Sequence, residues 1–218
     1  MALIKLGVVT LFHTSLSYSM SENFVLATAP TGLSPDLQRL LAELADSDRR
    51  AAAMVESLSD RQMNWQSSNT AWSIAQCLDH LAKSNTAYSA ALHGAIEKTR
   101  QESVPTPIAL LPGFLGRMFI RALEPPPKQK MKAPKSIVPS AQIDKSEVLR
   151  QFLDSQEAVR LVIQDGARLD LNRIRFKNPF FWFLRFTVGT GLLIIAAHNR
   201  RHLWQAQTIL ENPLFPKG

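Results

Sequence analysis

Residues 192–210, LLIIAAHNRRHLWQAQTIL, carry the pattern that decides the fold class. Apolar side chains recur there at steps of three and four residues, which is the spacing of an amphipathic helix, and Asn212-Pro213 ends the pattern. The side chains predicted to share one stripe of this helix are Ile194, Ile195, His198, His202, Gln205 and Ile209. Those predicted to face elsewhere are Asn199, Arg200 and Gln207. The sequence therefore predicts a helix whose two histidines, four residues apart, point into a helical core.

A second helix, beginning after Ser73, brings a third histidine to the interior. Ser73 and Gln76 form a capping-box pattern, and Trp72 and Cys77 occupy the two positions of a hydrophobic staple. At about 100° per residue, the inward sector of this helix contains Cys77, His80, Leu81, Ser84 and Tyr88. We therefore expect His80 to face the same core as the other two histidines.

Two more helices complete the predicted fold. Ser34-Pro35-Asp36 is typical of a helix start, and the apolar stripe that follows continues to Leu58. Asp144 and Glu147 give a second capping-box pattern, ahead of a helix that runs to about Asp165. Prolines break up the segment between, where only 108–123 is compatible with a short helix. These features predict an all-α fold, an antiparallel four-helix bundle with a long crossover between its second and third helices.

The same patterns give the domain boundaries. We expect a leader or disordered segment over residues 1–33, one helical domain over 34–212 and a tail over 213–218. The apolar run at 6–12 follows Lys5 and resembles a weak signal peptide, whereas a natural start at Met20 would make it an upstream extension. Both interpretations stay open. A cytoplasmic location is expected, with export by this weak signal left open.

Composition restricts the classes of partner. The single cysteine, Cys77, excludes an internal disulfide and a multi-cysteine zinc site, and we expect it to serve in packing. The net charge of +7 suits an anionic partner, but no nucleic-acid-binding motif carries it, so nucleic acid is not expected. The apolar stretch 180–197 is interrupted by Arg185, which makes a membrane span costly. Membrane contact is likewise not expected.

Three inward imidazoles are the ligand set of a catalytic zinc-type site, in which one position stays open for water or substrate. Zinc, nickel, iron and manganese all accept nitrogen ligands, so one divalent ion of open identity is predicted. The residue after His198 is Asn199, where a zincin protease has its general-base glutamate. Peptide hydrolysis is therefore disfavoured.

Two segments carry a family resemblance. The run Trp72-Ser73-Ile74-Ala75-Gln76-Cys77-Leu78-Asp79-His80-Leu81-Ala82 resembles the first signature of the DinB-like superfamily, and His198-Asn199-Arg200-Arg201-His202-Leu203-Trp204-Gln205-Ala206 resembles its last. The similarity covers Ser34 to Asn212. It implies a four-helix bundle, often a homodimer, with a divalent metal on three histidines that match His80, His198 and His202. Relatives include thiol-dependent transferases and isomerases, in which the metal brings a low-molecular-weight thiol to its thiolate form.

Three functions remain as hypotheses. The first is a metal-dependent enzyme of thiol-transferase or hydrolase type acting on a small molecule, with no second catalytic residue identified, since Asp79 projects about 100° away from His80. The second is a non-catalytic metal-binding or stress-associated domain, which predicts a closed coordination sphere and no adjacent cavity. The third is a membrane-peripheral protein that uses the basic crossover and the cluster at 180–186. Arg200 and Arg201 are expected at the solvent or in salt bridges, and Tyr88, Trp204 and Gln205 are candidates to line a pocket.

Overall fold

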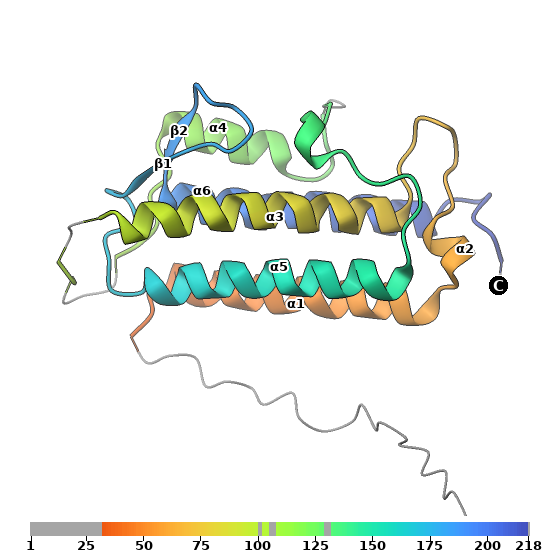
Figure 1. Ribbon diagram of the computed structural model, residues 1–218, viewed down its shortest axis with the longest axis horizontal. Coiled ribbons are helices and arrows are strands. Elements are labelled where there is room, and N and C mark those ends of the chain that lie inside the picture. Colours follow the sequence, from red (N-terminus) through yellow and green to blue (C-terminus); the bar gives the residue numbers. More distant parts are fainter. Residues whose placement is uncertain (1–31, 100–101, 105–107, 129–131, 218) are drawn as a thin grey trace, which may run out of the picture.

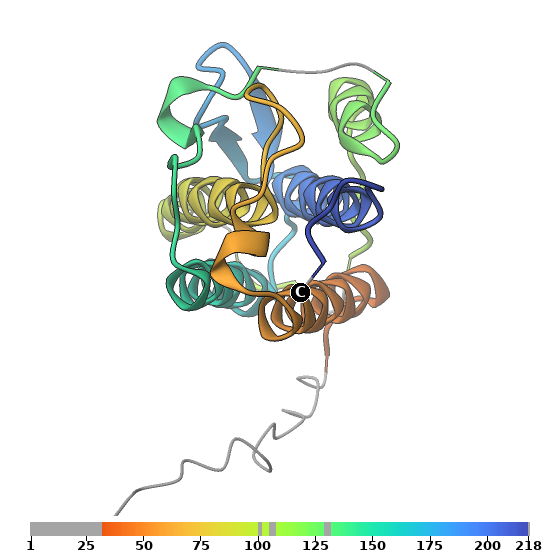
Figure 2. The same ribbon diagram turned by 90° about the vertical axis from the view of Figure 1, so that its right-hand side faces the viewer.

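The computed structural model describes residues 32–99, 102–104, 108–128 and 132–217. Its four longest helices are α1 (Pro35–Ser57), α3 (Ile74–Glu97), α5 (Lys145–Asp165) and α6 (Val188–Leu210). They lie alongside one another in two layers, with α3 beside α6 in one and α5 beside α1 in the other (Figures 1 and 2). The predicted helical class is therefore correct for most of the described chain.

The shorter elements lie outside these layers. They are α2 (Asp60–Met63), α4 (Phe114–Leu123), the 3₁₀ helix η1 (Lys135–Ile137) and the strands β1 (Arg175–Lys177) and β2 (Arg185–Thr187). Helix α4, η1 and the hairpin of β1 and β2 cover the outer side of α3 and α6 (Figure 1). Helix α4 falls within the segment 108–123 that the sequence allowed as helical.

The hairpin adds a small two-stranded sheet to the helical fold that the sequence predicted. Strands β1 and β2 pair antiparallel, with Phe176 opposite Phe186. Both phenylalanines are buried, while Arg175, Lys177 and Arg185 on either side of them are exposed. This alternation has the two-residue period of a half-buried strand. It spans only three residues in each strand, too few for the alternation to stand out from the surrounding basic and aromatic residues.

Local hydrogen bonds set the helix starts. The hydroxyl of Ser34 accepts from the backbone N–H of Leu37, and Ser73 and Gln76 form the predicted reciprocal capping box. Asp144 caps α5 by accepting from the N–H of Glu147. The Glu147 carboxylate binds Arg150 and Gln151, so only half of the second predicted box is present.

Helix α6 begins four residues before the predicted start. Thr187 caps it by accepting from the N–H of Thr190. A Cβ added at Gly189 would lie 2.9 Å from a Leu110 methyl group, and one at Gly191 would lie 2.6 Å from Leu92. The two glycines therefore allow the first turns of α6 to pack closely against its neighbours and do not interrupt the helix.

A polar network crosses the core and corrects one predicted orientation. Asn199 was predicted to face away from the core, but its side chain is buried. Its amide donates to Gln156 Oε1 at 3.0 Å, and its Oδ1 accepts from Asn85 at 3.1 Å. Asn85 also donates to Gln156 Oε1. The network thus joins side chains of α3, α5 and α6.

We expect Asn199→Ala to destabilise the fold. The substitution removes two buried hydrogen bonds and leaves donors and acceptors of Asn85 and Gln156 without their partner, a cost of about 2 kcal/mol in the free energy of unfolding. Urea unfolding, followed by circular dichroism, measures this loss in the free energy of unfolding. Gln207→Ala on an exposed position of the same helix is the control. Equal stability of the two variants would contradict a structural role for the network.

No helix in the described part of the chain is long and apolar enough to cross a membrane. Of the predicted leader, residues 1–31 lie outside the described residues, and the boundaries at 33 and 212 remain predictions.

Candidate metal centre

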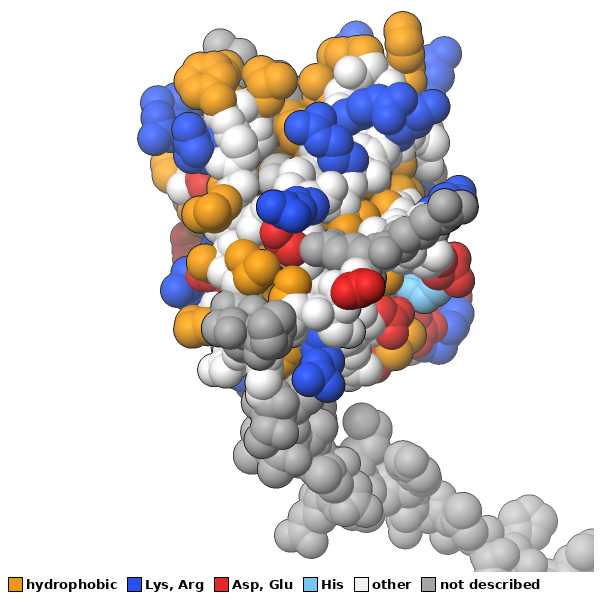
Figure 3. All heavy atoms as spheres, turned by 90° about the vertical axis from the view of Figure 1, so that its left-hand side faces the viewer, with side chains coloured by type: hydrophobic (Ala, Val, Ile, Leu, Met, Phe, Trp, Pro, Cys, Tyr) orange, Lys and Arg blue, Asp and Glu red, His pale blue; other side chains and the backbone are white. Residues whose placement is uncertain are grey.

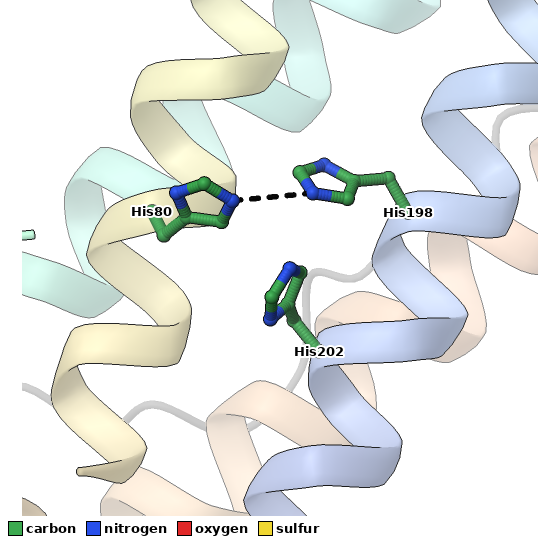
Figure 4. A group of neighbouring side chains, drawn as sticks. All are labelled: His80, His198 and His202. Atoms are coloured by element: carbon green, nitrogen blue, oxygen red, sulfur yellow. Dashed lines mark hydrogen bonds between the residues drawn. The ribbon is translucent and has the colours of Figure 1, made fainter. Parts of the chain in front are cut away.

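The three predicted histidines meet between α3 and α6. His80 comes from α3, and His198 and His202 come from consecutive turns of α6 (Figure 4). Each offers one ring nitrogen to a group in which all these nitrogens lie within 4.8 Å of one another. Nε2 of His80 and Nε2 of His198 are 3.2 Å apart. The structure therefore brings together the three histidines that helical periodicity placed on inward faces.

The outer ring nitrogens are held by neighbouring groups. Nδ1 of His80 donates to the carbonyl oxygen of Ile137 at 2.7 Å, because a carbonyl can only accept. Nδ1 of His198 lies 3.3 Å from the Ser84 hydroxyl, and Nδ1 of His202 lies 2.9 Å from Gln205 Oε1. The acceptors on Nδ1 of His80 and His202 fix the tautomer of these two rings and leave a lone pair on Nε2, which is the usual support of a metal-ligating histidine. The Ser84 hydroxyl can accept from His198 Nδ1 or donate to it.

Burial keeps these imidazoles neutral. His80 is 3% and His202 is 6% exposed. Burial lowers the pKa of all three histidines, and the neighbouring imidazoles lower those of His198 and His202 further, His202 to about 3. Neutral imidazole is the form that binds a metal ion. Lone pairs that converge at such short range are stabilised by a shared cation, so the donor set fits a divalent ion.

Trp72 covers the cluster. Its ring centre lies 4.8 Å from that of His80 and 5.5 Å from that of His202, and it stacks on His202 with an interplanar angle of 27°. The sequence assigned Trp72 to a hydrophobic staple with Cys77. Its packing against two histidines is an additional duty that local pattern could not indicate, because His202 comes from a distant helix.

A cavity of about 820 Å³ borders the three histidines. This volume is in the usual range for small-molecule sites. Tyr88, Trp204 and Gln205 contribute to its wall, as the sequence suggested. The charged side chains among its described lining residues are Lys128, Lys132 and Arg201, with no Asp or Glu beside them. The site is therefore open on one side to an apolar, positively charged chamber.

Other residues singled out in the sequence have structural contacts. Asp79 is buried and accepts from Lys83 Nζ at 2.7 Å and from the N–H of Ser140 at 2.8 Å, so it anchors the crossover. Arg200 forms salt bridges with Glu43 and Glu124, which is one of the two arrangements expected for it.

Cys77 and Arg201 are both buried. Burial raises the pKa of the Cys77 thiol, which agrees with the packing role expected of it. Arg201 was expected at the solvent or in a salt bridge. Its side chain is buried, which contradicts the first alternative, and it donates to the carbonyl of Ala122 at 3.0 Å. It thereby ties α6 to the end of α4. His93 is partly exposed beside Glu97 and Asp165, away from the cluster, and His13 lies outside the described residues.

Gln205→Leu tests the support of His202. We expect metal affinity to fall by about 10- to 100-fold, since the imidazole loses the acceptor that orients it while Nε2 is retained. Competition with a chromogenic chelator measures the dissociation constant. Gln207→Leu, on the outer side of α6, should leave affinity unchanged. Equal affinity in both variants would show that Gln205 does not orient the ring.

The helical fold, with three histidines clustered at the wall of a cavity, is that of a candidate metal-binding protein. Sequence comparison then gives the family. A profile of the DinB superfamily matches residues 43–206, a span that includes all three histidines. The chain belongs to the DinB superfamily, which confirms the resemblance seen in the sequence. Comparison with curated proteins and with solved structures gives no match.

Proposed function

We propose that this DinB-superfamily chain binds one divalent ion, zinc, nickel, iron or manganese, through His80, His198 and His202. We further propose that it is a metal-dependent enzyme of thiol-transferase or hydrolase type acting on a small molecule. The observation that carries the proposal is the convergence of three inward-facing imidazoles, two buried and that of His198 partly buried, at the wall of a cavity of about 820 Å³. A non-catalytic metal-binding domain would not need that cavity.

The ligand count favours a catalytic site over a structural one. Structural zinc sites have four protein ligands, whereas three histidines leave one position for a water or a substrate atom. A bound ion would lower the pKa of a thiol or water that reaches it. In the transferase case, the sulfur forms a bond to an electrophilic carbon, the leaving group departs with the bonding electrons, and the thiol proton goes to solvent.

The chain's own residues orient the site and control its surroundings. Ile137 and Gln205 hold the rings of His80 and His202, and Trp72 packs against both rings. No carboxylate among the described lining residues competes for the ion or repels an anionic substrate. Arg201, buried in the wall, favours a negative group on the molecule that enters.

We also infer that the four long helices form the antiparallel bundle that the sequence predicted. Because all three histidines come from one chain, the proposed site is complete without the homodimer that the family resemblance implies.

The test combines metal analysis with two assays on the full chain. After loading with each of the four ions, we expect about one ion per chain, and consumption of glutathione or cysteine with a chloronitrobenzene, or hydrolysis of a nitrophenyl ester. His198→Ala and chelation should abolish turnover. A chain that holds one ion but is inactive in every assay would favour the non-catalytic alternative. A chain that holds none would exclude both.

A further inference from the structure

Exposed apolar side chains are concentrated on one side of the molecule. The described part of the chain exposes ten large hydrophobic side chains, and six of them lie on or just before α4 and in the loop between β1 and β2. The six, here called the docking surface, are Leu111, Phe114, Leu115, Met118, Trp182 and Phe183. Trp182 is 84% and Phe114 is 68% exposed. Single exposed hydrophobic residues are ordinary, but such a concentration marks an interaction site.

The two parts of the docking surface are held together. Phe119 on the inner side of α4 packs against Phe181 with ring centres 6.1 Å apart, and Phe181 packs against Phe183 at 6.3 Å. The loop itself is braced by Asn178, whose Oδ1 accepts from the N–H groups of Phe180 and Phe181. These contacts thus fix the loop, while Trp182 and Phe183 remain exposed.

The charge of the chain is segregated to the same side. The described residues of the covering layer over α3 and α6, 108–128, 132–142 and 171–187, contain nine Lys and Arg and one Glu. The other described residues contain 13 Lys and Arg and 16 Asp and Glu. The single acid, Glu124, is paired with Arg200. Figure 3 shows hydrophobic and basic side chains together at the top of the molecule, with acidic side chains lower down.

Composition alone did not lead us to expect membrane contact, but with this segregation of apolar and basic side chains we propose that the surface docks on an anionic lipid bilayer. Protruding aromatic and aliphatic side chains enter the interfacial region, and Arg and Lys around them bind lipid phosphates and carboxylates. With no helix in the described residues able to cross a membrane, the contact is peripheral. A second copy of the chain is a poor occupant, because a symmetric contact would bring these cations against their own copies.

Helix α4 and the hairpin, which carry most of the docking surface, also line one side of the cavity. Phe119 and Leu123 from α4 and Phe180 and Phe181 from the hairpin line the cavity wall. A bilayer seated on α4 and the loop would therefore lie close to the chamber. The docking inference does not depend on the metal centre, and both are measured separately.

Co-sedimentation of the full chain with vesicles is the first test. We expect binding to vesicles of phosphatidylcholine with phosphatidylglycerol, and binding weaker by about tenfold or more to phosphatidylcholine alone or at high salt. Equal binding to both vesicle types, or none to the anionic ones at low salt, would overturn the proposal. Metal content measured on the same samples reports on the proposed function independently.

Two variants separate lipid docking from charge alone. Trp182→Ala with Phe183→Ala should weaken binding to anionic vesicles by about tenfold. Leu214→Ser is the matched control, since Leu214 is 76% exposed but lies in the C-terminal segment, away from α4 and the hairpin. Loss of binding in the control, or unchanged binding in the aromatic variant, would overturn the proposal. The second result would point to another segment or to a purely electrostatic surface that suits nucleic acid equally well.

The basic residues are tested in the same way. Arg117→Glu with Arg185→Glu should weaken vesicle binding by about tenfold, because two cations beside the docking surface become anions. Arg49→Glu with Arg61→Glu reverses two exposed cations on α1 and α2 and should have no such effect. Equal losses in the two pairs would show a response to net charge and contradict a defined surface.

The depth of Trp182 in the bilayer is the last measurement. Vesicles with brominated acyl chains should quench tryptophan fluorescence of the wild type, since Trp182 is the most exposed of the large hydrophobic side chains. Trp182→Phe keeps an aromatic ring and should bind normally while losing most of the quenching. Persistent quenching in this variant would place the inserted tryptophan elsewhere and overturn the proposed orientation.

Discussion

His198→Ala is expected to remove the metal ion. Two imidazoles would remain, and the lost ring is the one whose Nε2 lies 3.2 Å from Nε2 of His80. Loss of one of three ligands should weaken binding by well over about 100-fold, more than loss of an orienting partner does. Elemental analysis after dialysis should find about one ion per chain in the wild type and almost none in the variant.

The control for this experiment is His93→Ala. His93 is a helical histidine like the others, but it is partly exposed beside Glu97 and Asp165 and lies outside the cluster. Its removal should leave the metal content unchanged. Full occupancy in His198→Ala, with the fold intact by circular dichroism, would show that the three histidines do not form the binding site.

The metal-free protein is expected to lose stability in mild acid. Burial lowers the pKa of His80, His198 and His202 below the ordinary value of 6.5, that of His202 to about 3. Below pH 6.5 the unfolded chain therefore takes up protons that the folded chain resists. The free energy of unfolding should fall as pH decreases from 6.5, by up to about 1.4 kcal/mol per pH unit for each histidine that stays neutral.

Urea unfolding of chelator-treated protein between about pH 7.5 and pH 5 measures this effect, above the range where most carboxylates titrate. His198→Ala should lower the slope of stability against pH, because one of the three contributing histidines is lost, whereas His93→Ala should retain the wild-type slope. Added zinc should shift the loss of stability to lower pH, because the ion and protons compete for the same nitrogens. A profile that is flat in the wild type would show that the imidazoles are accessible to protons in the folded protein.

Local patterns predicted much of the fold and of the candidate site. Ser34 and Ser73 were identifiable as helix caps because their hydrogen bonds join residues three apart. His80, His198 and His202 were expected to meet because helical periodicity alone puts each on an inward face. These features depend on nearest neighbours along the chain, which is the information that a single sequence carries most clearly.

What the sequence did not predict depends on distant partners. Asn199 is turned inward by Asn85 and Gln156 of two other helices, and a polar residue at that position would ordinarily face solvent. Arg201 is buried because the end of α4 lies over it. The carbonyl that orients His80 belongs to Ile137, 57 residues away in a proline-rich segment without helical pattern. Such contacts become apparent only when the elements are assembled.

The bond between Ile137 and His80 makes the crossover part of the histidine cluster. The crossover is also joined to α3 through Asp79 and Ser140 and through Lys83 and Val138. Metal binding and the packing of the crossover on α3 should therefore be coupled. Contacts that hold the crossover on α3 strengthen the affinity for the ion, and the bound ion stabilises those contacts by the same free energy. Cleavage by a protease within this segment would thus report on metal occupancy, fast in the stripped protein and slow in the loaded one.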